Sequence, residues 1–272
     1  MGNKISRQIA KRKKSTRTNS SGESSSDSSS NIQLTPQLRT LAGRPYFDES
    51  FSSYILPADW EEADRVQALH FVLKHMFNGN YCAKLSDIIK PGTQEFPEAD
   101  VYGIDIASSF PNQIKPNNCH FQTCDILEGL PFDDNEFDYV FMRYMSVSIK
   151  KDQWLSVLKD IKRVMKPGGV IESVELNSFP YSMGPVMIQF MNKMNDAMIE
   201  VLGMELQVKL EPMFKELSFQ NVTSISKYIS LGKWDENTGK IGQIWTTNTY
   251  QMGESAKPIL AAAMNLTEDE WD

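Results

Sequence analysis

The sequence predicts an α/β fold in which helices cover both faces of a doubly wound, mostly parallel sheet. Short apolar runs of strand length alternate with longer segments of helical periodicity, which is the pattern of βαβ units. Right-handed crossovers would bring the strand ends to one edge of the sheet, where ligands of α/β proteins bind. The 272 residues, 40% of them hydrophobic and 23% charged, suit one soluble globular domain with a tail.

A helical lead-in is expected over residues 34–80, and its main helix over residues 57–77. Asp59 can cap the start of this helix, and two acidic residues follow at the positive end of the helix dipole. Apolar side chains form one stripe along the helix, and Asn78-Gly79-Asn80 ends it.

The remaining elements alternate as βαβ units require. The expected elements are strands at 101–106, 119–124, 137–142 and 170–174, a helix carrying Trp154, Leu158, Ile161 and Met165, a helix over 183–202, an edge strand over 219–231 and a helix over 254–272. An acid stands at or directly after the end of each of the first two strands. The turn Lys166-Pro-Gly-Gly169 separates a helix from the fourth strand.

Residues 1–33 are expected to form a disordered tail, and the domain to cover residues 34–272. The Ser-rich stretch at 18–33 cannot bury enough apolar surface to offset its chain entropy. Residues 1–17 carry seven Lys or Arg and no acid, so the rest of the chain carries −14 to reach the net charge of −7.

The extreme amino terminus predicts lipidation. Met1-Gly2-Asn3-Lys4-Ile5-Ser6 fits the pattern for N-myristoylation of Gly2. One myristoyl chain binds membranes only marginally, and the basic run supplies the second signal that anionic lipid would attract. This predicts a cytoplasmic protein at the cytoplasmic face of a membrane. The alternative is an ordinary disordered basic start or a nuclear signal.

Composition also argues against several kinds of partner. The acidic body is unsuited to nucleic acid, whose binding requires clustered Lys and Arg. No run approaches the ~18–20 apolar residues that span a bilayer. The three cysteines and three histidines show no metal-ligand spacing, so we expect no metal site and reduced thiols.

Four stretches carry a resemblance to a known family. They are Val101-Tyr-Gly-Ile-Asp-Ile106, Asp125-Ile126 with the following Leu130-Pro131-Phe132, Arg143-Tyr144, and Lys166-Pro-Gly-Gly169. Together they resemble class I S-adenosylmethionine-dependent methyltransferases of the fungal methyltransferase-domain type. The resemblance covers roughly residues 44–240 and implies a Rossmann-like sheet.

The resemblance implies S-adenosylmethionine as the cofactor. The cofactor-binding residues that it implies are Asp105, Ile106, Asp125, Ile126, Arg143 and Tyr144. Asp105 would accept hydrogen bonds from both ribose hydroxyls, and Asp125 one from the adenine amino group, while Arg143 and Tyr144 would face the methionine end. An acid such as Asp105 equally suits the ribose of NAD, and either acid could simply form a turn; the combination with Asp125 favours the methyl donor.

One part of the family pattern is missing. The family places a strand, a glycine-rich loop and a helix between Gln94 and Glu95, which are joined directly here. Gly92 and Val101 are nine positions apart where about 25 residues are needed, so roughly 17 are absent. We therefore expect the central first strand to be lacking, its neighbours to be left unpaired or to pair anew, and cofactor binding to be severely weakened.

The sequence thus predicts a methyltransferase scaffold with an unidentified methyl acceptor and impaired activity. Glu172 and Glu175 are candidates to line the acceptor site, with salt bridging as the structural alternative. The competing prediction is a membrane-tethered pseudoenzyme or adaptor. An NAD-dependent oxidoreductase is weaker, because it would need the same absent loop.

Overall fold

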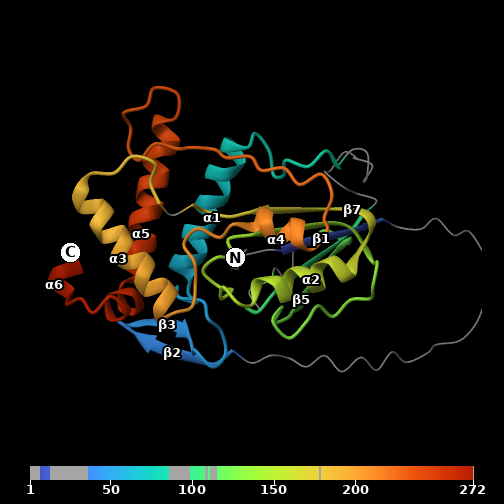
Figure 1. Ribbon diagram of the computed structural model, residues 1–272, viewed down its shortest axis with the longest axis horizontal. Coiled ribbons are helices and arrows are strands. Elements are labelled where there is room, and N and C mark those ends of the chain that lie inside the picture. The colour runs from blue at the N-terminus through green and yellow to red at the C-terminus, as the bar shows by residue number, and fades with distance from the viewer. Residues whose placement is uncertain are drawn as a thin grey trace, which may run out of the picture.

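A computed structural model describes residues 7–12, 36–85, 99–107, 110, 115–177 and 179–271. The elements are β1 (Arg7–Arg12), β2 (Leu38–Leu41), β3 (Arg44–Phe47), α1 (Trp60–Met76), β4 (Ala99–Asp105), β5 (Cys119–Thr123), β6 (Phe137–Arg143), α2 (Trp154–Val164), β7 (Met165–Val174), α3 (Pro185–Glu200), α4 (Leu210–Glu216), α5 (Gly239–Ala263) and α6 (Glu268–Trp271), as Figure 1 shows. The junction of Gln94 with Glu95 lies outside the described residues.

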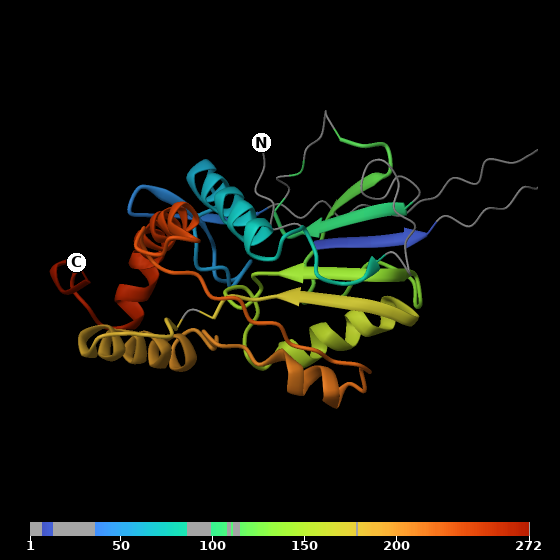
Figure 2. The ribbon, with the colours of Figure 1, turned by 90° about the horizontal axis from the view of Figure 1, so that it is seen from above.

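The main sheet has five strands in the order β5-β4-β1-β6-β7. The pairs β4–β5 and β6–β7 are parallel, as predicted for βαβ units. β1 lies between these pairs and runs antiparallel to both of its neighbours. Figure 2 shows the strands side by side, with the arrow of β1 pointing opposite to those of β4 and β6. The fold is therefore mixed α/β rather than uniformly parallel at its centre.

β1 corrects one expectation drawn from the sequence. Arg7–Arg12 belongs to the tail predicted to be disordered, yet it forms the middle strand of the sheet. β4 and β6 both pair with β1, so neither is left unpaired on that side. The loss of a first strand stays a prediction. The other residues of the predicted tail, Gly2 included, lie outside the described part of the chain.

The core of the sheet forms where alternate strand residues meet α2. Trp154, Leu158 and Val164 of α2 are fully buried against β6, whose Val140 and Met142 point to the same cluster. α4 adds partly buried apolar side chains to this cluster. The opposite face of the sheet packs Tyr139 and Phe141 against Leu85, in the segment that follows α1.

The lead-in helix α1 is fixed by charged side chains. Asp59 caps it as predicted and accepts a hydrogen bond from the Glu62 backbone N–H at 3.0 Å. Arg44 of β3 donates to both carboxylate oxygens of Asp59 at 2.7 Å. Farther along the helix, Arg65 binds Glu62 on one side and Asn248 of α5 on the other, which joins α1 to α5.

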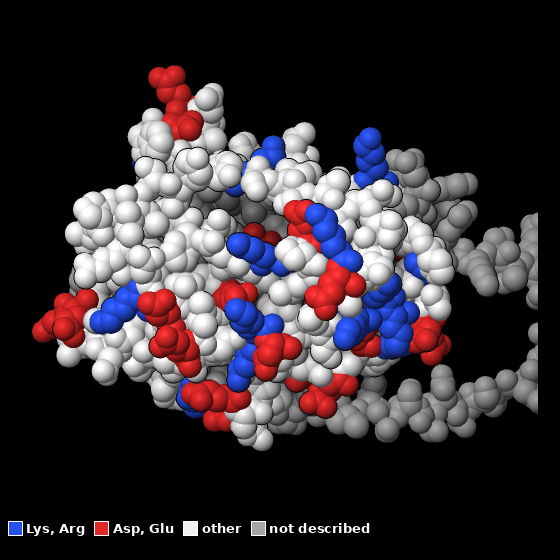
Figure 3. Space-filling model, viewed as in Figure 1, with Lys and Arg blue, Asp and Glu red and all other residues white. Residues whose placement is uncertain are grey.

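A second apolar cluster lies beyond the strand ends, where α3 and α5 pack on the lead-in (Figure 2). It holds Met191 and Met198 of α3, so two methionines of the predicted methionine-rich helix are core, and Met204 of the segment after α3. The surface over α3 and α5 in Figure 3 is largely uncharged, and α3 exposes Val186. No helix in the described ranges is both long and apolar enough to cross a membrane.

Two expectations about the carboxyl-terminal half were wrong. Residues 219–231 form no strand. The last long helix begins at Gly239 instead of residue 254, and a separate short helix, α6, follows it. Lys166–Gly169 falls within the bounds of β7, but the register with β6 passes over it, from Phe137 with Met165 to Tyr139 with Val170, and the predicted strand at 170–174 pairs with β6.

Candidate functional site

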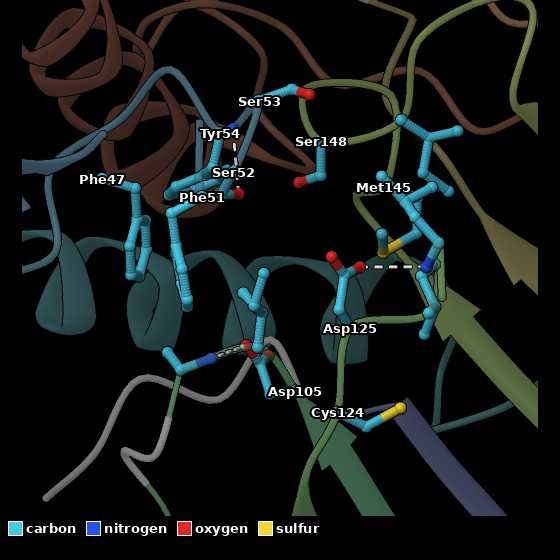
Figure 4. A pocket seen from close by; sticks show the side chains of 15 residues that line it. Phe47, Phe51, Ser52, Ser53, Tyr54, Asp105, Cys124, Asp125, Met145 and Ser148 are labelled. Carbon is cyan, nitrogen blue, oxygen red and sulfur yellow. Dashed lines mark hydrogen bonds between the residues drawn. The ribbon is translucent and has the colours of Figure 1, made fainter. Parts of the chain in front are cut away.

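A hollow lies where β4 and β5 end, at the carboxyl edge of their parallel pair. It measures about 660 Å³ including its open mouth. Asp105, Ile106, Asp125 and Ile126 line it, and Figure 4 shows both acids pointing into the space between the strand ends and the lead-in. The structure thus brings together four of the six residues that the sequence analysis assigned to the cofactor. Their binding role stays a prediction.

Asp105 is the last residue of β4 and is only 7% exposed. Its Oδ1 accepts a hydrogen bond from the Ala107 N–H at 2.9 Å, which fixes the orientation of the carboxylate at the strand tip. The Asp105 carbonyl oxygen accepts from the Cys124 N–H at 2.8 Å, so the two strand ends are tied together. The ladder bond therefore sets the separation of the two acidic side chains.

Asp125 lies two residues after the end of β5. Its Oδ1 accepts a hydrogen bond from the Leu127 N–H at 2.9 Å, the same local turn that Asp105 forms (Figure 4). Both carboxylates are thus held by backbone amides two residues farther along the chain. Each is therefore oriented by its own strand end.

The wall opposite the acids is aromatic and was not predicted. Phe47 ends β3, and Phe51 and Tyr54 follow in the loop that leads to α1 (Figure 4). The Phe47 and Phe51 rings stack with centroids 5.7 Å apart and planes 25° apart. The one sequence signal for this wall is the run of aromatic residues alternating with serines directly before the first helix.

Tyr54 connects this wall to the buried charges of α1. Its hydroxyl donates to Glu62 at 2.9 Å, and Arg65 donates to the same carboxylate. Burial, with the Glu62 charge beside it, raises the pKa of Tyr54 well above the ordinary value. The phenol therefore stays neutral, and the wall does not move independently of α1.

Arg143 and Tyr144 do not reach this hollow. Arg143 ends β6, and its guanidinium lies 2.9 Å from the His70 ring on α1, in a second, smaller hollow that Glu172 also lines. Burial lowers the pKa of Arg143. Tyr144 follows with a φ of 57°, and its buried hydroxyl has no hydrogen-bond partner among the described residues. The predicted methionine-end residues are thus separated from the two acids.

Glu172 and Glu175 bind backbone amides. Glu172 accepts hydrogen bonds from the N–H groups of Cys82 and Ala83, both at 2.9 Å, and from the Tyr139 hydroxyl at 3.2 Å. Glu175 accepts from the Met145 and Ser146 N–H groups at 3.0 Å. Because Met145 lines the first hollow, Glu175 braces part of its wall. Both glutamates therefore have a structural role near the end of β7, where they accept hydrogen bonds from backbone amides.

Comparison with known families supports the chemistry that the strand-end acids suggest. Residues 87–169 match the methyltransferase domain family. The matched region includes β4, β5, β6 and α2, and with them both acids of the hollow. The lead-in and its aromatic wall precede the matched region.

Curated proteins that resemble part of this chain include three from fungi. The secondary metabolism regulator laeA of Coprinopsis cinerea is 30% identical over 160 residues, which cover 51% of this chain and 39% of that protein. The N-methyltransferase verN of Clonostachys rogersoniana is 27% identical over 143 residues, with 45% and 50% covered. The probable methyltransferase ltbC of Aspergillus luteorubrus is 31% identical over 102 residues, with 32% and 36% covered. No solved structure matches significantly.

Two features of these alignments describe how much of this chain is matched. The chain spans half or less of the length of each of these three relatives. The laeA alignment runs over 160 residues but takes in only 51% of this chain, which is about 139 of its 272 residues. The verN alignment likewise runs over 143 residues but takes in 45% of this chain, which is about 122 residues. About 20 aligned positions therefore have no counterpart in this chain.

Proposed function

We propose that this chain is a class I methyltransferase scaffold that holds the adenosine half of S-adenosylmethionine in the hollow at the ends of β4 and β5. The observation that carries the proposal is that Asp105 and Asp125, fixed by adjacent parallel strand ends, line one hollow. A carboxylate at a strand tip can accept two charge-assisted hydrogen bonds from the ribose diol, the role given to Asp105. Asp125 would accept one from the adenine amino group.

The aromatic wall suits the flat face of a nucleobase. Phe51 stands opposite the acids, with Ile106 and Ile126 completing an apolar lining. An adenine ring between these surfaces would gain stacking and apolar contact while its amino group stays within reach of a carboxylate. Residues from the lead-in and from the strand ends would thus share the binding of the base.

Among the described residues, none forms a comparable cradle for the methionine half. In a parallel first strand, the loop after the strand would open at the carboxyl edge and present N–H groups at a helix start. β1 runs the other way, so the chain after Arg12 leaves at the opposite edge. The missing segment between Gln94 and Glu95, inferred from the sequence, is part of this proposal. We expect cofactor binding to be weak for this reason.

When bound, S-adenosylmethionine supplies an electrophilic methyl group, and the protein contributes mainly the position of the acceptor. Arg143 and Tyr144 remain the proposed neighbours of the methionine end, and Glu172 and Glu175 of the acceptor. The methyl acceptor is unassigned.

A pseudoenzyme or adaptor tethered to a membrane is the second candidate. The reversed direction of β1 favours it, because that direction removes the loop on which tight cofactor binding depends. In this function Gly2 and the basic residues would hold the scaffold at an anionic membrane surface. Sequencing the transcript between the codons for Gln94 and Glu95 separates the candidates. An inserted segment encoding a glycine loop supports the enzyme, and a true junction supports the adaptor.

Calorimetric titration of the full chain with S-adenosylmethionine and with adenosine tests the proposed site. If only the adenosine half is held, the two ligands bind with similarly weak affinity, and Asp105→Asn weakens both at least tenfold. Asp100→Asn, in the same strand and outside the hollow, is the matched control and should leave both affinities unchanged. Binding of S-adenosylmethionine a hundredfold tighter than that of adenosine would contradict the proposal that the methionine half is not held. Failure of both ligands to bind would contradict the site.

A further inference from the structure

β1 lies at the centre of the sheet although its sequence is not that of a central strand. Arg7–Arg12 reads Arg-Gln-Ile-Ala-Lys-Arg, in which four of the six residues are charged or polar. Strands in the middle of a sheet covered by helices are usually near-continuous apolar runs. This composition offers little apolar surface, and the structure describes the strand by its backbone ladder with β4 and β6. β1 is therefore the strand that can leave the sheet at the lowest cost.

The continuity of the sheet nevertheless depends on this strand. All six residues of β1 pair with β4, and Gln8–Ala10 also pair with β6. Without β1, the order β5-β4-β1-β6-β7 would separate into two parallel pairs. Each pair would expose an unpaired inner edge, and isolated two-stranded pieces are marginally stable at best. The strands affected are those that end in Asp105 and Arg143.

The same segment contributes to the basic character of the amino terminus. Arg7, Lys11 and Arg12 are three of the seven basic residues within residues 1–17. Each basic residue at an anionic membrane surface strengthens binding roughly fivefold, so these three together contribute about a hundredfold. A segment paired on both sides within a sheet cannot also lie along a lipid surface. The two placements therefore exclude each other.

We propose that β1 is an exchangeable strand: it completes the sheet in solution, and an anionic lipid surface withdraws it and opens the sheet between β4 and β6. The partner is a membrane surface rich in anionic headgroups, recognised by the basic residues of the β1 sequence. This goes beyond the proposed cofactor binding and does not depend on it. The membrane would control the two strands that carry predicted site residues.

Hydrogen exchange of the full chain, with phosphatidylcholine vesicles that contain or lack phosphatidylserine, tests this proposal. In solution and with neutral vesicles, the amides of β4 and β6 that face β1 should be protected. With anionic vesicles they should exchange at least tenfold faster, and high salt should restore protection because it screens the lipid charge. Unchanged protection in protein that cosediments with the anionic vesicles would overturn the proposal, as would failure to bind them.

Two triple variants with equal charge loss separate strand withdrawal from simple attraction. Arg7→Gln/Lys11→Gln/Arg12→Gln should keep the sheet protected in the presence of anionic vesicles, because β1 has lost its affinity for them. Lys13→Gln/Lys14→Gln/Arg17→Gln, which leaves β1 intact, should still show faster exchange when bound. Identical hydrogen-exchange rates in the two variants would contradict the proposal that β1 leaves the sheet.

A proline variant tests whether the strand is in the sheet at all. Ile9→Pro removes a backbone donor between Tyr102 and Val140 and should give fast exchange in β4 and β6 even without vesicles. Ser15→Pro, outside β1, should not. Equal protection in the two proline variants would show that β1 does not hold the sheet together.

Discussion

Tyr54 shows how a single residue can serve both the hollow and the charges beneath it. Its ring contributes to the aromatic wall, and its hydroxyl donates to Glu62, which Arg65 also binds. Glu62 is 1% exposed and Arg65 is 6% exposed, so this pair is stable only because each charge is fully partnered. The raised pKa of Tyr54 follows from the same burial.

This raised pKa predicts a loss of stability in alkali. A phenol whose pKa is higher in the folded state stabilises the fold fully below the unfolded value of about 10, and this contribution is lost as the pH rises through the folded value. The free energy of unfolding should therefore decrease above about pH 10, by up to ~1.4 kcal/mol per pH unit for each such tyrosine. Denaturant unfolding of Tyr54→Phe should show a shallower slope there. Tyr181→Phe, whose ring is 91% exposed, should keep the wild-type slope; equal slopes in both variants would contradict the assignment.

Among the elements, α5 shows how closely a helix can be tied to a neighbouring loop. A methyl group at Gly242 would lie against the Gly232 carbonyl oxygen and 2.7 Å from the Ser230 carbonyl oxygen. Gly253, in the same helix, has nothing within 4 Å of the position that a methyl group would take. Close packing therefore requires a glycine at 242, whereas nothing near position 253 excludes a side chain.

Replacing each of these glycines by alanine should change stability in opposite directions. Gly242→Ala should lower the free energy of unfolding by about 1–3 kcal/mol, because the loop before α5 would have to move. Gly253→Ala should raise it by about 1 kcal/mol, because alanine favours a helix interior. Urea unfolding of both variants measures the difference. A loss of stability at Gly253 as large as that at Gly242 would contradict the packing described for α5.

Element prediction from the sequence succeeded where a segment carries its own pattern. β4, β5 and β6 lie within two residues of their predicted bounds. β4 and β6 are largely apolar runs that end in a charged residue, and β5 alternates between half-buried and exposed residues. Residues 219–231 contain β-forming side chains but no strand, since a strand needs a neighbour that the local sequence cannot supply. β1 was not predicted, because Arg7–Arg12 has no apolar alternation. It is a strand only through its pairing with β4 and β6, which are distant in the sequence.

At the scale of the whole molecule, the candidate site forms where the lead-in meets the sheet edge. The two acids could be predicted, because a carboxylate directly after a buried strand falls at the edge where α/β proteins bind ligands. The aromatic wall could not, since Phe47 and Phe51 come close to Asp105 only through the packing of the lead-in on α5. The separation of Arg143 from the acids also depends on this packing, because its partner His70 lies on α1.

The binding of one adenosine by Asp105 and Asp125 is tested most directly by amide chemical shifts. The Ala107 and Leu127 N–H groups donate to the two carboxylates, so each reports on one acid. Titration of the full chain with adenosine should shift both signals along one saturating curve, and Asp105→Asn should weaken the response of Leu127 as well as that of Ala107. Shifts confined to other regions, or two curves with unrelated midpoints, would show that the two acids do not hold one ligand.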